Sequence, residues 1–423
     1  MPILNQRDYR VAKARFEQLG KARASQSMLA ESAAGLSADV SDARRSALVA
    51  EQERLAKEIE TYESLRSRDL PTLHSIESVD LGMLPIIGRI TRGWSQKQLA
   101  ELLGLKEQQI QRYEAERYAG VSLNRYERIL EILSVELSAK VQRVSGTEPN
   151  DAQSELKLDP ALIREILKRG WVITDTSKVE AAEAIHSYVR SGLKLSTSRV
   201  FHRQNLRHSS AVDEAALNCW RARALQLAYA NAPRSKGRFN IADIAWLGEL
   251  VQLSGQKEGP IAAIDLLHDK GIVVVIEPHL VNTRLDGAAF LLSTGVPVIA
   301  LTLRYDRLDY FWFTLLHELG HILLHFNRGL DSGFVDDLEA DGEDLEKEAD
   351  TFAKSTLISD EIWKAAPVRF SKSTKMMIEF AESLGIHVAI VAGRIRQERR
   401  DYKKFGELVG QGELQKMFAT NRP

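Results

Sequence analysis

The residues with the clearest chemical potential are His317, Glu318 and His321, which form the pattern His-Glu-x-x-His inside an apolar run. Residues four apart lie on one face of a helix, so the two imidazoles can reach one metal ion. Glu318 is rotated about 100° from His317, so its carboxylate can approach a water on the metal rather than the metal itself. This set suits Zn²⁺. The alternative is a buried helix that carries two histidines without a metal.

A third metal ligand is needed, because catalytic zinc sites usually have three protein ligands. Residues 345–353 read as a second helix, on which Glu346 and Asp350 share a face with two alanines. Small side chains there would let this helix approach the first closely. We predict that Glu346 binds the metal and that Asp350 hydrogen-bonds to one of the ligating histidines. Glu348 is the weaker candidate for the third ligand. An acidic helix start that favours the helix dipole would explain Glu346 but not the alanines.

Such a site predicts metal-assisted peptide hydrolysis, in which Glu318 is the catalytic base and a further group stabilises the oxyanion. His387 is the candidate for that second catalytic role, although a histidine that caps its own backbone is the alternative. Tyr305 and Tyr310 are weaker candidates, and His325 reads as a structural or supporting residue. Cys219 could block the metal as a thiolate, but a buried, inert side chain is the favoured interpretation.

The elements that must position these residues follow a clear order. Three β-rich apolar runs precede the histidine helix, at 271–276, 287–292 and 296–301. They predict a small antiparallel sheet that leads directly into the metal helix, as in zincin peptidases. Upstream, helical patterns form a middle region after a polar linker at 145–158. These patterns lie at 159–168, 178–191, 211–230, 241–251 and 260–270.

A second informative stretch spans residues 82–118. Gly93 ends one helix, Ser95 is a good N-cap for the next, and Gly104 allows the tight turn of a helix-turn-helix. Six Lys/Arg and four Asp/Glu give this stretch a balance of 6 − 4 = +2. This modest balance implies salt-sensitive DNA binding that could require a dimer.

Polar side chains on and near the second helix of that motif are the expected DNA contacts, because glutamine can read adenine and arginine can read guanine or phosphate. The alternative is a trihelical scaffold that docks a protein partner. The predicted DNA-binding residues are Gln96, Lys106, Gln108, Gln109, Gln111 and Arg112.

The N-terminal 75 residues read as a polar helical extension. Residues 40–68 contain no Gly or Pro, and a narrow apolar stripe near heptad spacing runs along them. A break near Gly35 separates them from an earlier helix, so a helical hairpin or a short coiled coil is expected. Its role is either dimerisation or partner docking, or simple packing on the rest of the chain.

Composition limits the protein class. The chain has 423 residues, 44% of them hydrophobic, and 57 basic and 58 acidic side chains give 57 − 58 = −1. The one cysteine excludes an intrachain disulfide and fits a reducing compartment. No apolar run reaches about 18 residues, and the N-terminus lacks the basic start and apolar core of a signal peptide. We therefore expect a cytoplasmic protein without a membrane partner.

Two family resemblances follow from these motifs. Residues 81–137 resemble the Xre-like helix-turn-helix of phage repressors. The His317–His321 motif, the Glu346-x-x-x-Asp350-x-Phe-Ala motif and the segment 386–394 resemble the ImmA/IrrE zinc metallopeptidases. The resemblance implies a bacterial or phage protein that cleaves or regulates transcriptional repressors. The sequence departs from that family at 357–359, which predicts a different loop after the second helix.

The sequence thus predicts an α+β, mostly α, chain of four parts. These are a helical extension (1–75), a five-helix-type helix-turn-helix domain (80–142), a helical middle region (155–265) and a zincin-like metallopeptidase domain (266–418). The predicted function is a zinc-dependent endopeptidase, linked to DNA binding, that regulates transcription by cleaving a repressor or other regulator encoded nearby. A homodimer is possible. The alternative is a DNA-binding repressor or antitoxin-like regulator with a structural or vestigial metal site.

Overall fold

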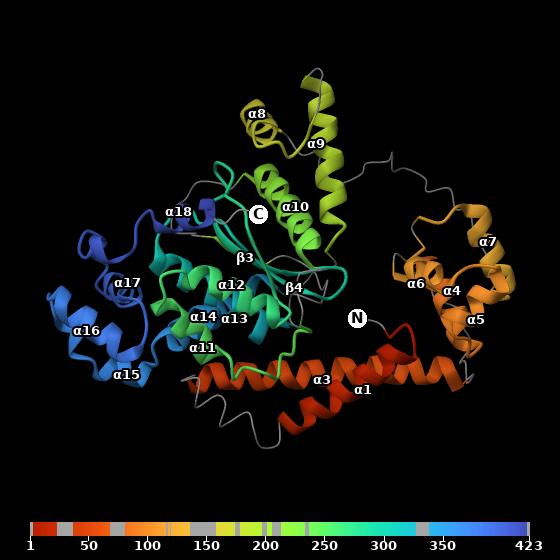
Figure 1. Cartoon of the computed structure of the whole chain (residues 1–423), viewed down its shortest axis with the longest axis horizontal. Coiled ribbons are helices and arrows are strands. Elements are labelled where there is room, and N and C mark those ends of the chain that lie inside the picture. The colour runs from red at the N-terminus through yellow and green to blue at the C-terminus, as the bar shows by residue number, and fades with distance from the viewer. Residues whose placement is uncertain are drawn as a thin grey trace. The chain divides into compact units, whose positions relative to one another are not determined.

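The computed structural model describes residues 3–22, 37–67, 81–115, 117–118, 120–135, 158–173, 178–196, 201–204, 213–232, 237–326 and 338–420. The chain divides into two compact units (Figure 1). One contains Met1–Ala22 and Ala50–Asn150, and the other contains Arg23–Val49 and Asp151–Pro423. Within the described ranges, no helix is long and apolar enough to cross a membrane.

The first unit contains the expected N-terminal helices, α1 (Gln6–Lys21) and the second half of α3 (Ala38–Ser67). The predicted apolar stripe on α3 is buried except at its end, where Leu65 is half-buried, and Tyr9 of α1 stacks on Tyr62 with ring centroids 5.1 Å apart. This burial supports the interpretation of an extension that packs on its own chain. The predicted break near Gly35 lies outside the described residues.

The helix-turn-helix follows in the same unit as α4 (Leu84–Thr91), α5 (Gln96–Leu103), α6 (Glu107–Ala115) and α7 (Leu123–Ile132), after a 3-10 turn at Leu81–Met83. Ser95 caps α5 in a capping box with Gln98. Gly104 has φ 66°, a left-handed conformation that suits the turn before α6. Four of the five expected α-helices are described, and the predicted end of the domain at 136–142 lies outside the described residues.

A buried ion pair holds the helices of this motif together. Arg89 of α4 donates from Nε to Oε1 of Glu114 at 2.5 Å and from Nη2 to Oε2 at 2.8 Å. Arg89 also donates to the Trp94 carbonyl at 2.9 Å. The two side chains are only 3% and 1% exposed, so this bidentate pair is shielded from water.

The second unit is built on a four-stranded sheet in the order β1-β3-β4-β2. Its strands are β1 (Phe201–Gln204), β2 (Val273–Ile276), β3 (Leu285–Leu291) and β4 (Pro297–Leu301). The expected antiparallel pairing is right for β3 and β4 but wrong for β2, which pairs parallel to β4. The reason is that the chain passes from β2 to the far side of β4, and the β3–β4 hairpin then returns beside β2. The sequence did not predict β1, a four-residue strand that pairs with β3.

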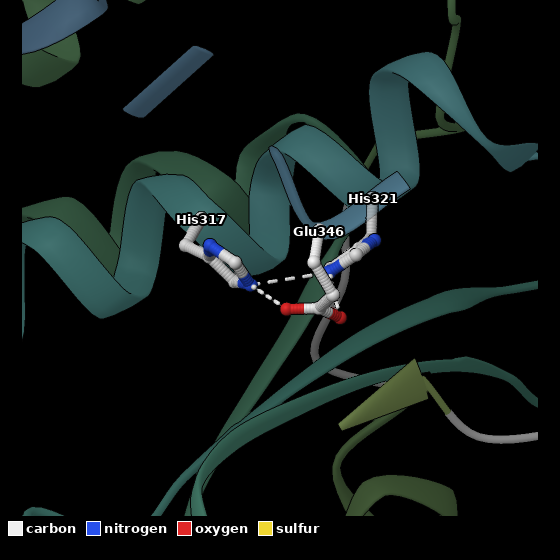
Figure 2. Close-up of side chains that lie close together, drawn as sticks. All are labelled: His317, His321 and Glu346. Carbon is white, nitrogen blue, oxygen red and sulfur yellow. Dashed lines mark hydrogen bonds and ion pairs between the residues drawn. The ribbon is translucent and has the colours of Figure 1, made fainter. Parts of the chain in front are cut away.

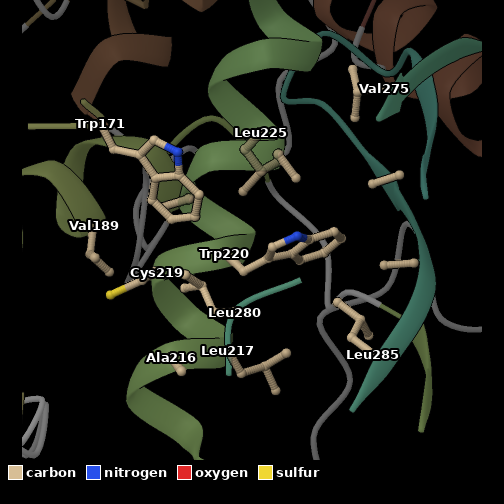
Figure 3. Packing of buried hydrophobic residues seen from close by; sticks show 14 of the residues in the cluster. Trp171, Val189, Ala216, Leu217, Cys219, Trp220, Leu225, Val275, Leu280 and Leu285 are labelled. Carbon is tan, nitrogen blue, oxygen red and sulfur yellow. The ribbon is translucent and has the colours of Figure 1, made fainter. Parts of the chain in front are cut away.

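Helices cover both faces of this sheet. Five helices precede the histidine helix in this unit: α8 (Pro160–Lys168), α9 (Lys178–Leu193), α10 (Glu214–Asn231), α11 (Leu247–Gln252) and α12 (Gly259–Asp269). The first three share one core with the sheet, whereas α12 contacts the histidine helix, because a Cβ on Gly259 would lie 3.3 Å from Trp312. Trp220 and Leu225 of α10 lie in one core with alternate sheet residues such as Val275 and Phe290 (Figure 3). Segments expected in the middle region and in the metallopeptidase domain therefore share one core.

The C-terminal helices are α13 (Leu308–Leu324), α14 (Leu338–Leu357), α15 (Asp360–Ala365), α16 (Thr374–Leu384), α17 (Val388–Arg399) and α18 (Glu413–Thr420). Short 3-10 turns lie at Leu253–Gly255, Pro367–Phe370 and Gly406–Leu408. The buried helix α13 packs on the sheet face opposite α10. It approaches α14 closely, because a Cβ on Gly320 would lie 3.2 Å from Ala349 Cα. This contact confirms the expected close approach of the two helices.

Candidate metal centre and DNA-binding surface

Three side chains from α13 and α14 converge on one point (Figure 2). The Nε2 atoms of His317 and His321 are 3.2 Å apart. Glu346 Oε2 lies 3.2 Å from His317 Nε2, and Glu346 Oε1 lies 3.3 Å from His321 Nε2. Both histidines are buried, whereas the Glu346 side chain is 40% exposed. The cluster therefore lies at the end of a buried helix and reaches solvent beside Glu346.

The spacing of these donor atoms fits a metal ion. Tetrahedral coordination with bonds of about 2.0–2.1 Å separates neighbouring ligand atoms by roughly 3.3 Å. Here the two Nε2 atoms are 3.2 Å apart, each lies 3.2–3.3 Å from a different oxygen of Glu346, and one ligand atom from each residue lies within 4.8 Å of the other two. Two imidazoles and one carboxylate are also a ligand set that Zn²⁺ accepts, and three protein ligands leave a fourth position for water or substrate. The cluster is thus a possible metal site.

Hydrogen bonds to the Nδ1 atoms of His317 and His321 orient both rings from the side away from the cluster. His317 Nδ1 lies 3.0 Å from Asp350 Oδ1, as the sequence reasoning predicted for Asp350. His321 Nδ1 lies 3.0 Å from His325 Nδ1, and His325 Nε2 lies 2.9 Å from Glu348 Oε2. If His321 offers its Nε2 lone pair to a metal, its Nδ1–H donates to His325, whose Nε2–H then donates to Glu348. Both imidazoles are thereby held in the tautomer that binds a metal.

The contact between His325 and Glu348 was not predicted from the sequence, where Glu348 is only the weaker candidate for the third ligand. Glu348 lies about 200° around α14 from Glu346, so it cannot share a face with that residue. The signal that could have found it is the spacing of His325, which lies four residues after His321 and hence next to it on α13.

The protonation states of the cluster also suit a metal. Burial lowers the pKa of His321 to about 4, so its imidazole is neutral near pH 7. Burial opposes ionisation of Glu346, but hydrogen bonds from His317 and His321 outweigh it and lower the pKa of that carboxyl. Neutral imidazole and ionised carboxylate are the forms that bind metals.

Glu318 is fully buried and faces strand β3. A Cβ on Gly287 would lie 2.8 Å from Glu318 Oε1 and 2.9 Å from Thr314 Cγ2. Only glycine therefore leaves room for this carboxylate between α13 and β3. The sequence reasoning missed Gly287, although a glycine inside a strand often marks such a close approach.

The predicted DNA-binding residues divide into two groups. Lys106, Gln108, Gln111 and Arg112 are exposed on or beside α6. Gln111 also donates to Glu107 Oε1 at 3.2 Å within α6, whereas Gln96 and Gln109 are half-buried and make contacts inside the domain. The Gln96 side chain donates to Glu114 Oε2 at 2.8 Å, and Gln109 Oε1 accepts from the Lys106 backbone N–H at 3.1 Å. These two side chains support the ion pair and the start of α6, so they are weaker candidates for base contacts than the sequence suggested.

Comparison with known families agrees with both sites. A helix-turn-helix family model matches residues 88–139, and the peptidase M78 model, an IrrE N-terminal-like domain, matches residues 268–396. The chain carries both of these domains. The searches of curated proteins and of solved structures found no match.

The IrrE-like domain contains the whole candidate metal centre, from the sheet to the end of α14. It also contains His387, which the structure does not bring into the metal cluster. The His387 side chain caps α17 by accepting from the Ala389 backbone N–H at 3.1 Å. The capping alternative thus describes the Nδ1 contact, which leaves the Nε2–H of a neutral His387 as a donor, so the catalytic role stays a prediction.

Cys219 lies outside the IrrE-like domain and is buried in the core formed by α10 and the sheet (Figure 3). It is not part of the metal cluster among the described residues. Burial raises the pKa of its thiol to about 12, which favours the neutral form. These observations support the interpretation of an inert core side chain.

Proposed function

We propose that this chain is a zinc-dependent endopeptidase that regulates transcription by cleaving a repressor or another regulator, and that its helix-turn-helix binds DNA. The observation that supports the proposal is the convergence of His317, His321 and Glu346, with ligand atoms within 4.8 Å of one another, together with Glu318 at the position after His317 on the same helix. A purely structural metal site needs the three ligands but has no use for a carboxylate there.

In this proposal, each residue of the centre has a distinct task. A zinc ion held by His317, His321 and Glu346 would supply Lewis-acid chemistry that makes water more acidic and polarises a peptide carbonyl. Glu318 accepts a proton from the attacking water at its carboxylate and returns it to the leaving amine nitrogen. Asp350 keeps the His317 ring in place through its 3.0 Å contact.

The helix-turn-helix supports a link to transcription. Its exposed side chains on α6, Gln108 and Arg112, are of the types that read adenine and guanine. A DNA site can be found by selection from randomised duplexes. Changing both residues to Ala should then reduce the preference for that site by about 1–3 kcal/mol per lost base contact. Arg128→Ala, which removes a charge from α7, is the matched control and should keep the preference for the selected site.

The peptidase proposal is tested with the purified chain and transcription regulators encoded by neighbouring genes. Wild type should contain one zinc per chain and cleave one of these regulators, and Glu318→Gln should keep the zinc and lose cleavage. Glu382→Gln, an exposed change on α16, is the matched control. Equal cleavage by wild type and Glu318→Gln, or no stoichiometric metal, would overturn the proposal. The repressor alternative would be favoured by a different result. In that case wild type and Glu318→Gln would bind stoichiometric metal and DNA equally well, and neither would cleave a regulator.

A further inference from the structure

A cavity of about 600 Å³ lies beside the N-terminal half of α13. Pockets that bind small ligands or peptide side chains typically measure about 300–1,000 Å³. Five of its fourteen lining residues are cationic, and a single acid, Asp309, lies among them. The cationic lining residues are Arg284, Arg304, Arg307, Lys354 and Arg394. The lining therefore combines a size suited to several side chains with a strong excess of positive charge.

Most of the acids that pair with these cations are not among the residues that line the cavity. Arg307 pairs with Asp309 and so offsets the one acid in the lining. Arg394 pairs with Asp360 at 2.8 Å, outside the lining. Lys354 and Arg304 also lie near acids outside the lining, Asp350 at 3.6 Å and Asp286 at 3.7 Å, so the lining itself keeps an excess of cations over acids.

Arg304 is the lining cation whose hydrogen bonding is least complete. Its contact with Asp286 is 3.7 Å long, beyond hydrogen-bond distance, and its buried Nη1 atom has no hydrogen-bond partner among the described residues, although the side chain as a whole is 26% exposed. Its guanidinium lies 5.2 Å from the centre of the Tyr305 ring, and the rings of Tyr305 and Tyr310 are 4.4 Å apart. This aromatic wall orients the guanidinium and gives the cavity an apolar side.

Two lining residues connect the cavity to the candidate metal centre. Phe313 lies one turn before His317 on α13, with ring centroids 6.2 Å apart. Lys354 Nζ lies 3.6 Å from Asp350 Oδ2, and Asp350 Oδ1 contacts His317. The cavity thus adjoins the Nδ1 side of His317 through Phe313 and Lys354, while the three candidate metal ligands are not among its lining residues.

We propose that this cavity binds an acidic segment of the protein substrate, next to the peptide bond that is cleaved. The proposal rests on the proposed endopeptidase function and names the substrate chemistry that the same site selects. Carboxylates of Asp or Glu would accept hydrogen bonds from Arg304 and its neighbours, and an adjacent apolar side chain would contact the tyrosines.

The test uses binding, so it does not depend on turnover. Full-length Glu318→Gln protein, loaded with zinc and immobilised, is mixed with a peptide library from a digested bacterial proteome. Retained peptides are identified by mass spectrometry. They should be enriched in Asp and Glu, and Arg304→Gln should abolish that enrichment. A retained peptide should bind Arg304→Gln about ten-fold more weakly, since one hydrogen bond to a charged group is lost. Arg304→Lys keeps the charge and should recover part of the affinity.

Lys375→Gln is the matched control, because it removes one cation from an 84% exposed side chain outside the cavity. It should leave the enrichment unchanged. Retained peptides no more acidic than the library, or equal retention by Arg304→Gln and wild-type cavities, would overturn the proposal. The proposal would also be overturned if inorganic pyrophosphate bound in a way that depends on Arg304 while acidic and neutral peptides bound equally. That result would favour a small anion as the ligand. Arg304-dependent acidic peptides without cleavage by the wild type would instead count against the peptidase proposal alone.

Discussion

Glu348 offers a sharp test of the metal centre, because it lies two contacts away from His321, a proposed metal ligand. It accepts from His325 Nε2 at 2.9 Å, and His325 contacts His321 Nδ1 at 3.0 Å. Glu348→Gln keeps an acceptor oxygen but removes the negative charge. We expect the change to weaken zinc binding without removing any ligand.

The magnitude follows from the contacts. A hydrogen bond to a charged group contributes about 1.5–3 kcal/mol and a neutral one about 0.5–1.5, so the direct loss at His325 is about 1 kcal/mol. The Glu348 side chain is 33% exposed, which weakens its charge further. The expected loss is therefore up to about five-fold in zinc affinity, since ten-fold needs about 1.4 kcal/mol, and lies just below the roughly 10–100-fold seen when groups behind a metal ligand are changed.

The assay is competition between the metal-free protein and a chromophoric zinc chelator. Four proteins form a cycle: wild type, Glu348→Gln, His325→Ala and the double variant. If Glu348 acts through His325, its substitution should have no further effect once His325 is Ala. Thermal melting of the metal-free proteins checks that each is folded. A Glu348→Gln affinity equal to that of the Glu382→Gln control, or the same loss in both backgrounds, would refute the reasoning.

Three further changes test other parts of the structure. Gly287→Ala places a Cβ 2.8 Å from Glu318 Oε1, so it should lower kcat for peptide cleavage about 100-fold while zinc content stays the same; an unchanged kcat would contradict this. Because burial raises the pKa of Cys219 from 9.0 to about 12, a thiol reagent should label it at pH 8 only after unfolding. The unfolded thiol ionises first, so stability should fall as the pH rises from 9 to 12, and Cys219→Ala should show a smaller fall. Glu114→Gln leaves the buried Arg89 charge without its carboxylate, so urea unfolding of the first unit should show a loss of about 3–5 kcal/mol, and a loss under about 1 kcal/mol would argue against the pair.

Local signals in the sequence predict the core of the metal centre well. His317 and His321 converge because a four-residue spacing places both on one helical face. Glu346 could be predicted because it shares a helical face with two alanines, and small residues mark the face of α14 that packs against α13. The contacts of Glu348 and Gly287 depend instead on how α13 meets α14 and β3. No periodicity within one segment contains that information.

The fold shows the same division between local and non-local information. The predicted helices and three apolar strands correspond to observed elements, since each has a strong period or composition of its own. The strand β1 was missed because Phe-His-Arg-Gln is short and mostly polar, and only pairing with β3 makes it a strand. The parallel pairing of β2 was missed because strand order is a property of chain connections, which the strand sequences do not specify.

Helix α14 links the metal centre to the packing of the domain. It supplies Glu346 to the cluster and both carboxylates that orient the histidines, Asp350 and Glu348. Three negative charges on neighbouring turns of one helix repel one another, and that repulsion opposes the docking of α14 on α13. The small residues Gly320 and Ala349 allow the two helices to approach closely. A bound cation would offset the repulsion, so metal binding and the α13–α14 interface should stabilise each other. The small residues at this interface therefore matter for the chemistry as well as for the fold.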